Sequence, residues 1–547
     1  MLKLAAVLLG VCLFQSTQSE QSEQSEPSAA AVAAVAGASK SLSVAEAAAE
    51  VDRIFERSWQ SSGVQPAAVS SDEEFVRRLY LDLAGRVPAV SEVRQFLADE
   101  RLDKRSALVD SLLDSPAFVR HFTILWRNAL IPEAFNDLSG RRLVPGFEAW
   151  LWTQFSAGVP YDRMVRELLT VSLDSGGLDG GGAAAGPALR SASSPAAFYV
   201  IREMRPENLA AGTARSFLGV RLDCAQCHDH PFDRWKQGQF WSLAAFYSGF
   251  RPVDAEAGMS AVLAERRDSR SIAIPDKDQT VQASFLEGEQ PDWGLNRSAR
   301  EVLADWVTSR GNPWFSRMAA NRVWALFMGQ GIVHPVDDFS ENNPPSHPEV
   351  LQLLADQLVA HDFDLQFLVR TITRTRVYQL SSRQTHESQS DPLQFARAAV
   401  RGLTPEQLFD SLAEATGYYQ PYRTDNPFVI SAETPRATFL ELFRDEGDSP
   451  LQKETTILQA LAMMNGEFVD AATSLENSQT LGGVVEFPLM TDEERLETLF
   501  LAALSRRPVE SERAAMLEYV RRSESASAAL ADVFWALLNS SEFVLNH

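Results

Sequence analysis

The chain has 547 residues and a formal net charge of -23, so it is long enough for roughly two to four domains with apolar cores. The excess of carboxylates excludes a nucleic-acid partner, because phosphates would be repelled and no run of Lys and Arg offsets that repulsion. A redox partner protein with a basic surface is compatible with this charge.

The N-terminus has the pattern of a secretory signal. Lys3 is followed by the apolar run Leu4–Phe14 and by the small residues Thr17 and Ser19. We therefore predict a signal peptide at residues 1–19, removed to leave a periplasmic or secreted protein. The run is too short to cross a bilayer, and no other stretch reaches transmembrane length. The Ser/Glu/Ala-rich residues 20–42 are typical of a disordered spacer.

Helical periodicity begins at residue 43 and continues to residue 254, which predicts a first helical domain. A Gly-, Ala- and Ser-rich stretch at 175–195 interrupts it as a long loop or linker. The expected helices are Val44–Trp59, Ser71–Leu83, Ser91–Asp99, Lys104–Leu113, Pro116–Leu130, Phe147–Phe155, Tyr161–Val171, Pro206–Leu218 and Gln237–Phe250.

The pattern changes at residues 255–292, where 271–275 and 281–285 have the composition of short strands. We predict a β-containing linker here and a second helical domain at 293–547. The fold class is thus mainly α, with two helical domains and a small β excursion between them. The later helices are expected at Pro313–Met328, Leu351–Val359, Leu365–Tyr378, Pro405–Thr416, Thr456–Met464, Asp492–Leu504, Ser511–Arg521 and Val533–Val544.

Two distant segments share a signature. Residues 79–92 align without gaps to residues 499–512, with Leu, Leu, Arg, Pro, Ser and Glu in common. Further on, residues 112–119 resemble residues 537–544. Each copy predicts a helix, a stop at Arg and Pro, a restart at Ser-Glu and a closing helix. The pattern favours an old duplication over generic helix-turn-helix sequence.

The strongest chemical motif is Cys224-Ala225-Gln226-Cys227-His228, which contains both cysteines left after signal removal. The spacing Cys-x-x-Cys-His is typical of covalent attachment of haem c, in which two thiols add to the vinyl groups and the adjacent imidazole binds the iron. The expected helices on either side have apolar faces that can wall a flat cofactor. We therefore predict an exported haem protein with an electron-transfer role.

Two alternatives remain open for the same residues. Cys224, Cys227, His228 and His230 can hold zinc or another transition metal, and a protein with such a site can be a hydrolase. The two cysteines can instead form a disulfide in a cofactor-free scaffold. No nucleophile triad, phosphate loop or paired-carboxylate motif is present, so whether the chain is an enzyme stays open.

A sixth iron ligand is not fixed by the sequence, and the candidates are His347, His230, His121 and Met204. Ser346 and Glu349 have the spacing of a capping box, which places His347 in the first turn of a helix. The helix dipole there disfavours the imidazolium, so a neutral ring able to bind a metal is expected. The metal candidates are thus His228, His230 and His347.

Residues 217–220 together with 224–232 resemble the cytochrome-c-like domain of unknown function that is abundant in planctomycetes. Asn321-Arg322-Val323-Trp324, Asp337-Asp338-Phe339 and residues 343–349 resemble the second domain that follows it in those proteins. The resemblance covers most of the chain from about Ser43 and implies an exported protein without a known reaction. Many relatives carry a separate cytochrome c domain, whereas Cys-x-x-Cys-His occurs once in this sequence.

Export can be tested directly. N-terminal sequencing of the protein purified from its natural source should begin near Glu20, because the apolar run at Leu4–Phe14 directs cleavage just after it. A mature protein that retains Met1 would contradict the predicted signal peptide.

Overall fold

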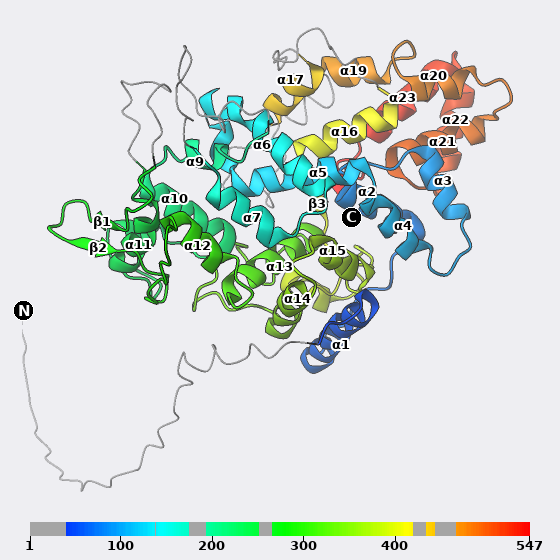
Figure 1. The fold of residues 1–547 in the computed structure, drawn as a ribbon. Helices are drawn as coiled ribbons and strands as arrows, with labels where there is room; N and C mark the ends of the chain where they lie inside the picture. Colours follow the sequence, from blue (N-terminus) through cyan, green and yellow to red (C-terminus); the bar gives the residue numbers. More distant parts are fainter. Residues whose placement is uncertain (1–39, 137, 174–192, 251–264, 419–433, 444–465) are drawn as a thin grey trace, which may run out of the picture. The chain divides into compact units, whose positions relative to one another are not determined.

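Helices make up most of the described chain, as the 3.6-residue periodicity predicts, and the mainly α fold class is confirmed. The structure is a computed structural model that describes residues 40–547 except 137, 174–192, 251–264, 419–433 and 444–465 (Figure 1). The signal peptide predicted at 1–19, the helix predicted at Thr456–Met464, and most of both the spacer and the loop at 175–195 lie outside the described residues. In the described part, no helix combines the length and apolarity needed to cross a bilayer.

The first half contains the helices expected from the apolar spacing. Most ends shift by a few residues, whereas the helix expected at Phe147–Phe155 begins nine residues earlier, at Leu138. In chain order they are α1 (Val44–Ser62), α2 (Asp72–Leu83), α3 (Val90–Ala98), α4 (Lys104–Leu113), α5 (Pro116–Leu130), η2 (Pro132–Phe135), α6 (Leu138–Ser156), α7 (Tyr161–Thr170), α9 (Ala197–Val200), α10 (Pro206–Thr213), η3 (Ala214–Leu218), η4 (Asp223–Gln226), α11 (Gln237–Ala244) and η5 (Ala245–Tyr247).

The second half is also helical. Its elements are α12 (Ala299–Val307), α13 (Pro313–Met328), α14 (Pro348–Ala360), α15 (Leu365–Arg374), η7 (Glu387–Gln389), η8 (Pro392–Gln394), α16 (Pro405–Thr416), α17 (Pro435–Leu442), α19 (Glu467–Thr473), α20 (Gln479–Glu486), α21 (Asp492–Leu504), α22 (Glu510–Arg522) and α23 (Ala526–Leu538).

Two small antiparallel sheets accompany the helices. The predicted β excursion is confirmed by β1 (Ser271–Ala273) and β2 (Thr280–Gln282), which pair with Ile272 opposite Val281. The other sheet joins β3 (Arg401–Gly402) to β4 (Leu545–Asn546). This second pair brings the C-terminal end of the chain next to α2 and β3 (Figure 1).

Local signals explain where the helices begin. Ser43, Ser298, Thr404 and Thr491 each cap a helix and pair with a Glu or Gln three residues later, so two exposed backbone N–H groups are satisfied at each start. Proline occupies the first turn of α5, α10, α13, α14 and α16, where its missing N–H is not needed.

The apolar core runs through both predicted helical domains. One buried cluster extends from Ala47 in α1 to Ala396, also contains Leu501 of α21, and includes residues on both sides of the β1–β2 hairpin. A second cluster joins Leu81 and Val87 to the helices from α16 to α23. Residues 40–547 accordingly form one compact unit. The segments predicted as separate domains therefore share their apolar interior.

The two copies of the internal repeat have the same local structure. In each, a first helix (α2 or α21) is followed within two residues by a left-handed backbone, at Gly85 with φ 70° and at Ser505 with φ 59°, and then by a second helix (α3 or α22). The prediction of helical hairpins around Pro88 and Pro508 is confirmed.

The side chains of the repeat match as closely as its backbone. Arg86 forms a two-pronged ion pair with Glu92 at 3.0 and 3.1 Å, and Arg506 does the same with Glu512 at 2.8 and 2.9 Å. Each glutamate also accepts the backbone N–H that starts its own helix, at 2.7 and 2.8 Å. A shared clamp of this detail supports duplication, because generic helix-turn-helix sequence does not require it.

Exchanging the left-handed turn residue of one copy for that of the other should change the stability of the protein by different amounts at Gly85 and Ser505. A Cβ on Gly85 would lie 2.5 Å from Nδ1 of the buried His121, so Gly85→Ser should lower the free energy of unfolding by about 2–4 kcal/mol. Ser505 already has a side chain, and its buried hydroxyl has no hydrogen-bond partner among the described residues. Ser505→Gly should therefore change stability by less than about 1 kcal/mol.

Urea unfolding of both variants and of the wild-type chain measures this difference. Equal losses of stability in the two variants would contradict the role assigned to His121.

Candidate functional site

The Cys-x-x-Cys-His motif lies in the connection between α10 and α11. Helix α10 continues into the π-helical turn η3, which ends at Gly219 with a left-handed φ of 71°. The chain then enters the short turn η4, which contains Cys224, and His228 follows just beyond it. The two elements that flank the motif were predicted as helices, and both are helical, although α10 is completed by the π turn.

Helix α11 holds the motif in place through its first turns. The side chain of Gln237 donates to the carbonyl oxygens of Gln226 and Cys227 at 3.1 and 2.9 Å. The indole N–H of Trp241 donates to the same Gln226 carbonyl at 3.0 Å. The Asp229 carboxylate accepts the backbone N–H of Gln237 at 3.0 Å, as a helix N-terminus favours. The backbone of the motif is thus fixed from one side.

The reactive groups of the motif face solvent. Cys224 and Cys227 are exposed and carry free thiols. The ring of His228 is exposed as well. A reagent or an enzyme from outside can therefore reach both sulfur atoms without unfolding the chain.

Backbone contacts assign opposite tautomers to the two neighbouring histidines. Nδ1 of His228 lies 2.7 Å from the carbonyl oxygen of Asp229, and since a carbonyl only accepts, Nδ1 carries the proton. Its Nε2 is then the lone-pair nitrogen, which is the form that binds a metal. Nδ1 of His230 instead accepts the N–H of Phe232 at 3.3 Å, so its Nε2 carries the proton. His228 is the better prepared ligand.

The donor set fits a covalently attached haem, whereas the expected apolar slot is not formed by the flanking residues. Trp235 and Phe240 are only 2% and 0% exposed. Trp235 packs against Trp314, with ring centroids 6.2 Å apart, and Arg234 covers it from another side. These aromatic rings fill the core and do not wall an open cleft. Phe232, in contrast, is 78% exposed and lies on the surface just after the motif.

The other candidate ligands lie in the protein interior. His347 packs on Phe55 and Phe395, with ring centroids 4.5 and 5.7 Å away. His121 is buried and contacts Gly85. Met204 is buried before α10. Across the described ranges, no group of three or more His, Cys, Asp and Glu side chains is arranged to hold a metal ion.

The prediction for the start of α14 was wrong in detail. His347 is the residue that precedes the helix, with Pro348 as the first helical residue, and it makes no capping hydrogen bond. Ser346 donates to the carbonyl of Ile332 and Glu349 pairs with Arg57, so the expected capping box does not form. The ring is neutral, as predicted, but because burial lowers its pKa to about 4.

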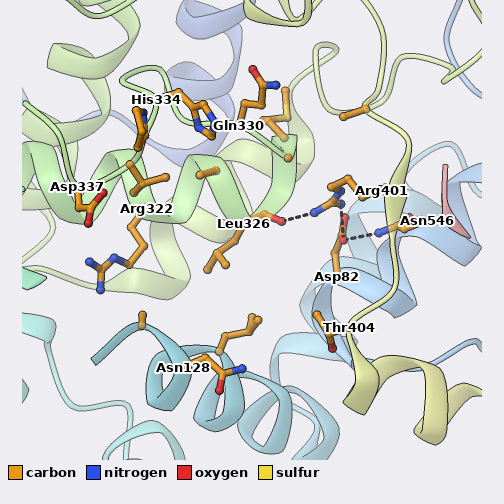
Figure 2. A pocket seen from close by; sticks show the side chains of 18 of the residues that line it. Asp82, Asn128, Arg322, Leu326, Gln330, His334, Asp337, Arg401, Thr404 and Asn546 are labelled. Carbon is orange, nitrogen blue, oxygen red and sulfur yellow. Dashed lines mark hydrogen bonds and ion pairs between the residues drawn. The ribbon is translucent and has the colours of Figure 1, made fainter. Parts of the chain in front are cut away.

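A second site is a cavity of about 700 Å³ that the sequence did not reveal. Its walls come from the ends of α2, α5, η3, α13 and the segments after α13 and before α16. At one end Arg401 donates to Asp82 at 2.7 Å, and Asn546 donates to the same carboxylate at 2.7 Å. Arg322, His334 and Asp337 lie at the other end (Figure 2).

Comparison with protein families gives two matches. The PSCyt2 family, a protein of unknown function (DUF1549), matches residues 50–251. The PSD1 family, a protein of unknown function (DUF1553), matches residues 299–520. The order and extent agree with the resemblance inferred from the motifs.

The chain therefore carries both family domains, PSCyt2 followed by PSD1. Comparison with curated proteins and with solved structures finds no match. The Cys-x-x-Cys-His motif belongs to the PSCyt2 match, and the cavity is lined by residues of both matches.

The cavity residues are spread along the sequence, which explains why sequence reasoning missed them. Arg215 and Arg221 flank the PSCyt2 motif, while Arg322 and Asp337 belong to PSD1 motifs that were recognised without a role. The sequence did offer one indication of a site, because Arg322 and Asp337 lie in two polar motifs within the same PSD1 match. Only the fold shows that both face the same space.

The buried histidines should make the PSCyt2–PSD1 protein sensitive to acid. Burial, which outweighs the attraction of Glu406 and Asp391, lowers the pKa of His121 and His347 from 6.5 to about 4. Between these values the unfolded chain takes up protons that the folded chain excludes, so the free energy of unfolding falls as the pH falls. The loss should reach about 3 kcal/mol for each ring below pH 4.

Urea unfolding at pH 7 and pH 5 tests this. The double variant His121→Asn/His347→Asn should lose less stability between the two pH values than the wild-type chain. His386→Asn is the matched control, because His386 is exposed, and it should behave like the wild type. An equal pH dependence in all three proteins would contradict the assignment.

Proposed function

We propose that this chain is an exported protein that carries a c-type haem on Cys224 and Cys227, with His228 as the iron ligand, and that it transfers electrons. The observation that carries the proposal is the state of the motif. Both thiols are free and exposed, and the hydrogen bond from Nδ1 of His228 leaves its Nε2 available. These are the groups that haem attachment requires.

The arrangement of the donors favours haem over zinc. Zinc needs three or four donors that converge on one point, and the described part of the chain holds no such group. Haem attachment instead uses two thiols for the vinyl groups and one imidazole for the iron, and the motif contains these three groups. The motif therefore supplies the residue types that haem attachment uses.

The surroundings of the motif support a haem on the surface. Gln237 and Trp241 hydrogen-bond to the backbone between the two cysteines, to which the thioether bonds would attach the haem. Phe232 offers an exposed apolar ring next to the motif. When bound, haem supplies one-electron exchange with a partner. The charge of -23 favours a partner protein with a basic surface, because complementary charge speeds encounter.

Haem attachment predicts a covalent product. The wild-type chain, exported from a host that has haem-attachment machinery, should give a haem-stained band on a denaturing gel, because thioether bonds survive unfolding whereas coordinated zinc is lost. Cys224→Ser/Cys227→Ser should abolish the band. His228→Ala should keep some stain and change the iron spectrum.

The matched control is His386→Ala, which removes an exposed imidazole that is not among the candidate ligands. Its spectrum should equal that of the wild type. A colourless wild-type protein with stoichiometric zinc would replace the proposal with the metal-binding alternative. A colourless, metal-free protein with a Cys224–Cys227 disulfide would leave the scaffold.

A further inference from the structure

The cavity between the two family domains carries an excess of positive charge in a strongly acidic protein. Among its described lining residues, six arginines face four carboxylates. Two of the arginines have a carboxylate each, because Arg401 pairs with Asp82 at 2.7 Å and Arg202 pairs with Glu133 at 3.3 Å. The excess is therefore concentrated elsewhere in the cavity.

Two arginines share the single carboxylate of Asp337. Arg215 donates its Nε to one oxygen, and Arg221 donates Nη2 and Nε to the other at 2.6 and 3.2 Å. These hydrogen bonds, which outweigh the effect of burial, keep the pKa of Asp337 below its usual value, so the group is ionised. The side chains of Arg215 and Arg221 are 44% and 40% exposed. Their remaining N–H groups are available to a second acceptor.

Arg322 adds a third charge behind this pair. Its Nη2 donates to the carbonyl of Ser216 at 3.1 Å, whereas its Nη1 is shielded from solvent and has no acceptor among the described residues. Asp337 acts on it electrostatically, but burial dominates and lowers its pKa. Asp223 and Glu133 also act on Arg215 from outside this group. Asp337 thus pairs with Arg215 and Arg221 and acts on Arg322 without contacting it.

We propose that this end of the cavity binds the oxyanion group of a small organic anion, such as a carboxylate, sulfate, sulfonate or phosphate. Arginine N–H groups match the oxygens of such anions in pairs. Arg215 and Arg221 contact the anion, and Arg322 strengthens the local positive potential. The inference does not rest on haem, since none of these residues belongs to the Cys-x-x-Cys-His motif.

The size and the apolar lining of the rest of the cavity indicate what kind of molecule carries the oxyanion group. A volume of about 700 Å³ suits a small organic molecule and is larger than an inorganic ion needs. Apolar side chains line much of the wall between the two charged ends, among them Leu125, Trp126, Pro132, Leu326 and Met328. The ligand class is therefore an anion with an apolar body.

Binding of naphthalene-1-sulfonate to the full chain, measured by calorimetry, tests the site. The sulfonate should bind, and the neutral naphthalene-1-sulfonamide should bind at least about tenfold more weakly, because it lacks the charge that the arginines recognise. Arg215→Gln and Arg221→Gln should each weaken sulfonate binding about tenfold. Raising the NaCl concentration from 20 to 200 mM should weaken it further.

The matched control is Arg205→Gln. Arg205 also pairs with acidic neighbours and is 54% exposed, but it does not line the cavity among the described residues. This variant should bind as the wild type does, and circular dichroism should show that all variants are folded. Equal binding of the two naphthalene probes, or unchanged affinity in folded Arg215→Gln and Arg221→Gln, would overturn the proposal.

The carboxylates of an attached haem have the same chemistry as a diffusible anion. Comparing haem-loaded chain with Cys224→Ser/Cys227→Ser chain distinguishes the two sources. Sulfonate binding only in the haem-free chain would support the site and assign it to haem carboxylates. Equal binding in both would support the site and assign it to a diffusible ligand.

Discussion

One buried arginine, Arg77 in α2, connects the beginning of the fold to its end. Its guanidinium donates to the carbonyl oxygens of Ala503 at 3.0 Å and Phe543 at 2.8 Å. Ala503 lies in the last turn of α21, where the helix dipole leaves carbonyl oxygens partly negative. Burial lowers the pKa of Arg77 to about 10, so the group is still charged at neutral pH. Without these carbonyls, the interior would hold a charge with no partner, which is strongly destabilising.

Two further polar residues of α2, Arg78 and Asp82, make buried hydrogen bonds with residues of the PSD1 domain. Arg78 donates to the carbonyl oxygens of Tyr378 and Leu380 at 2.6 and 2.9 Å. Asp82 accepts the hydroxyl of Tyr378 at 2.9 Å and also forms the ion pair with Arg401. Polar side chains of a helix in the PSCyt2 domain therefore have their hydrogen-bond partners in the PSD1 domain. This explains why two families meet in one compact unit, and why a cavity between them has fixed walls.

Features that depend on residues close in the sequence, such as helices and turns, could be predicted, whereas features that depend on contacts between distant residues could not. The β1–β2 hairpin, the hairpins at Pro88 and Pro508 and the predicted helices that fall within the described residues follow from local periodicity and turns, and these are present. The Cys-x-x-Cys-His motif was located, but the burial of Trp235, which removes the expected slot, depends on distant Trp314. The cavity required Arg215 and Arg322 to meet across more than a hundred residues, which no local pattern encodes.

The long separation between Arg77 and its acceptors has a consequence for biosynthesis. Ala503 follows Arg77 by 426 residues, so the ribosome completes α2 long before the carbonyls that receive its charge exist. Until then α2 cannot bury its polar face at low cost, and the early part of the chain stays open to chaperones and proteases. A chain interrupted before α21 lacks those acceptors altogether. Such a truncated chain would leave the charge of Arg77 without the carbonyl oxygens that accept its hydrogen bonds.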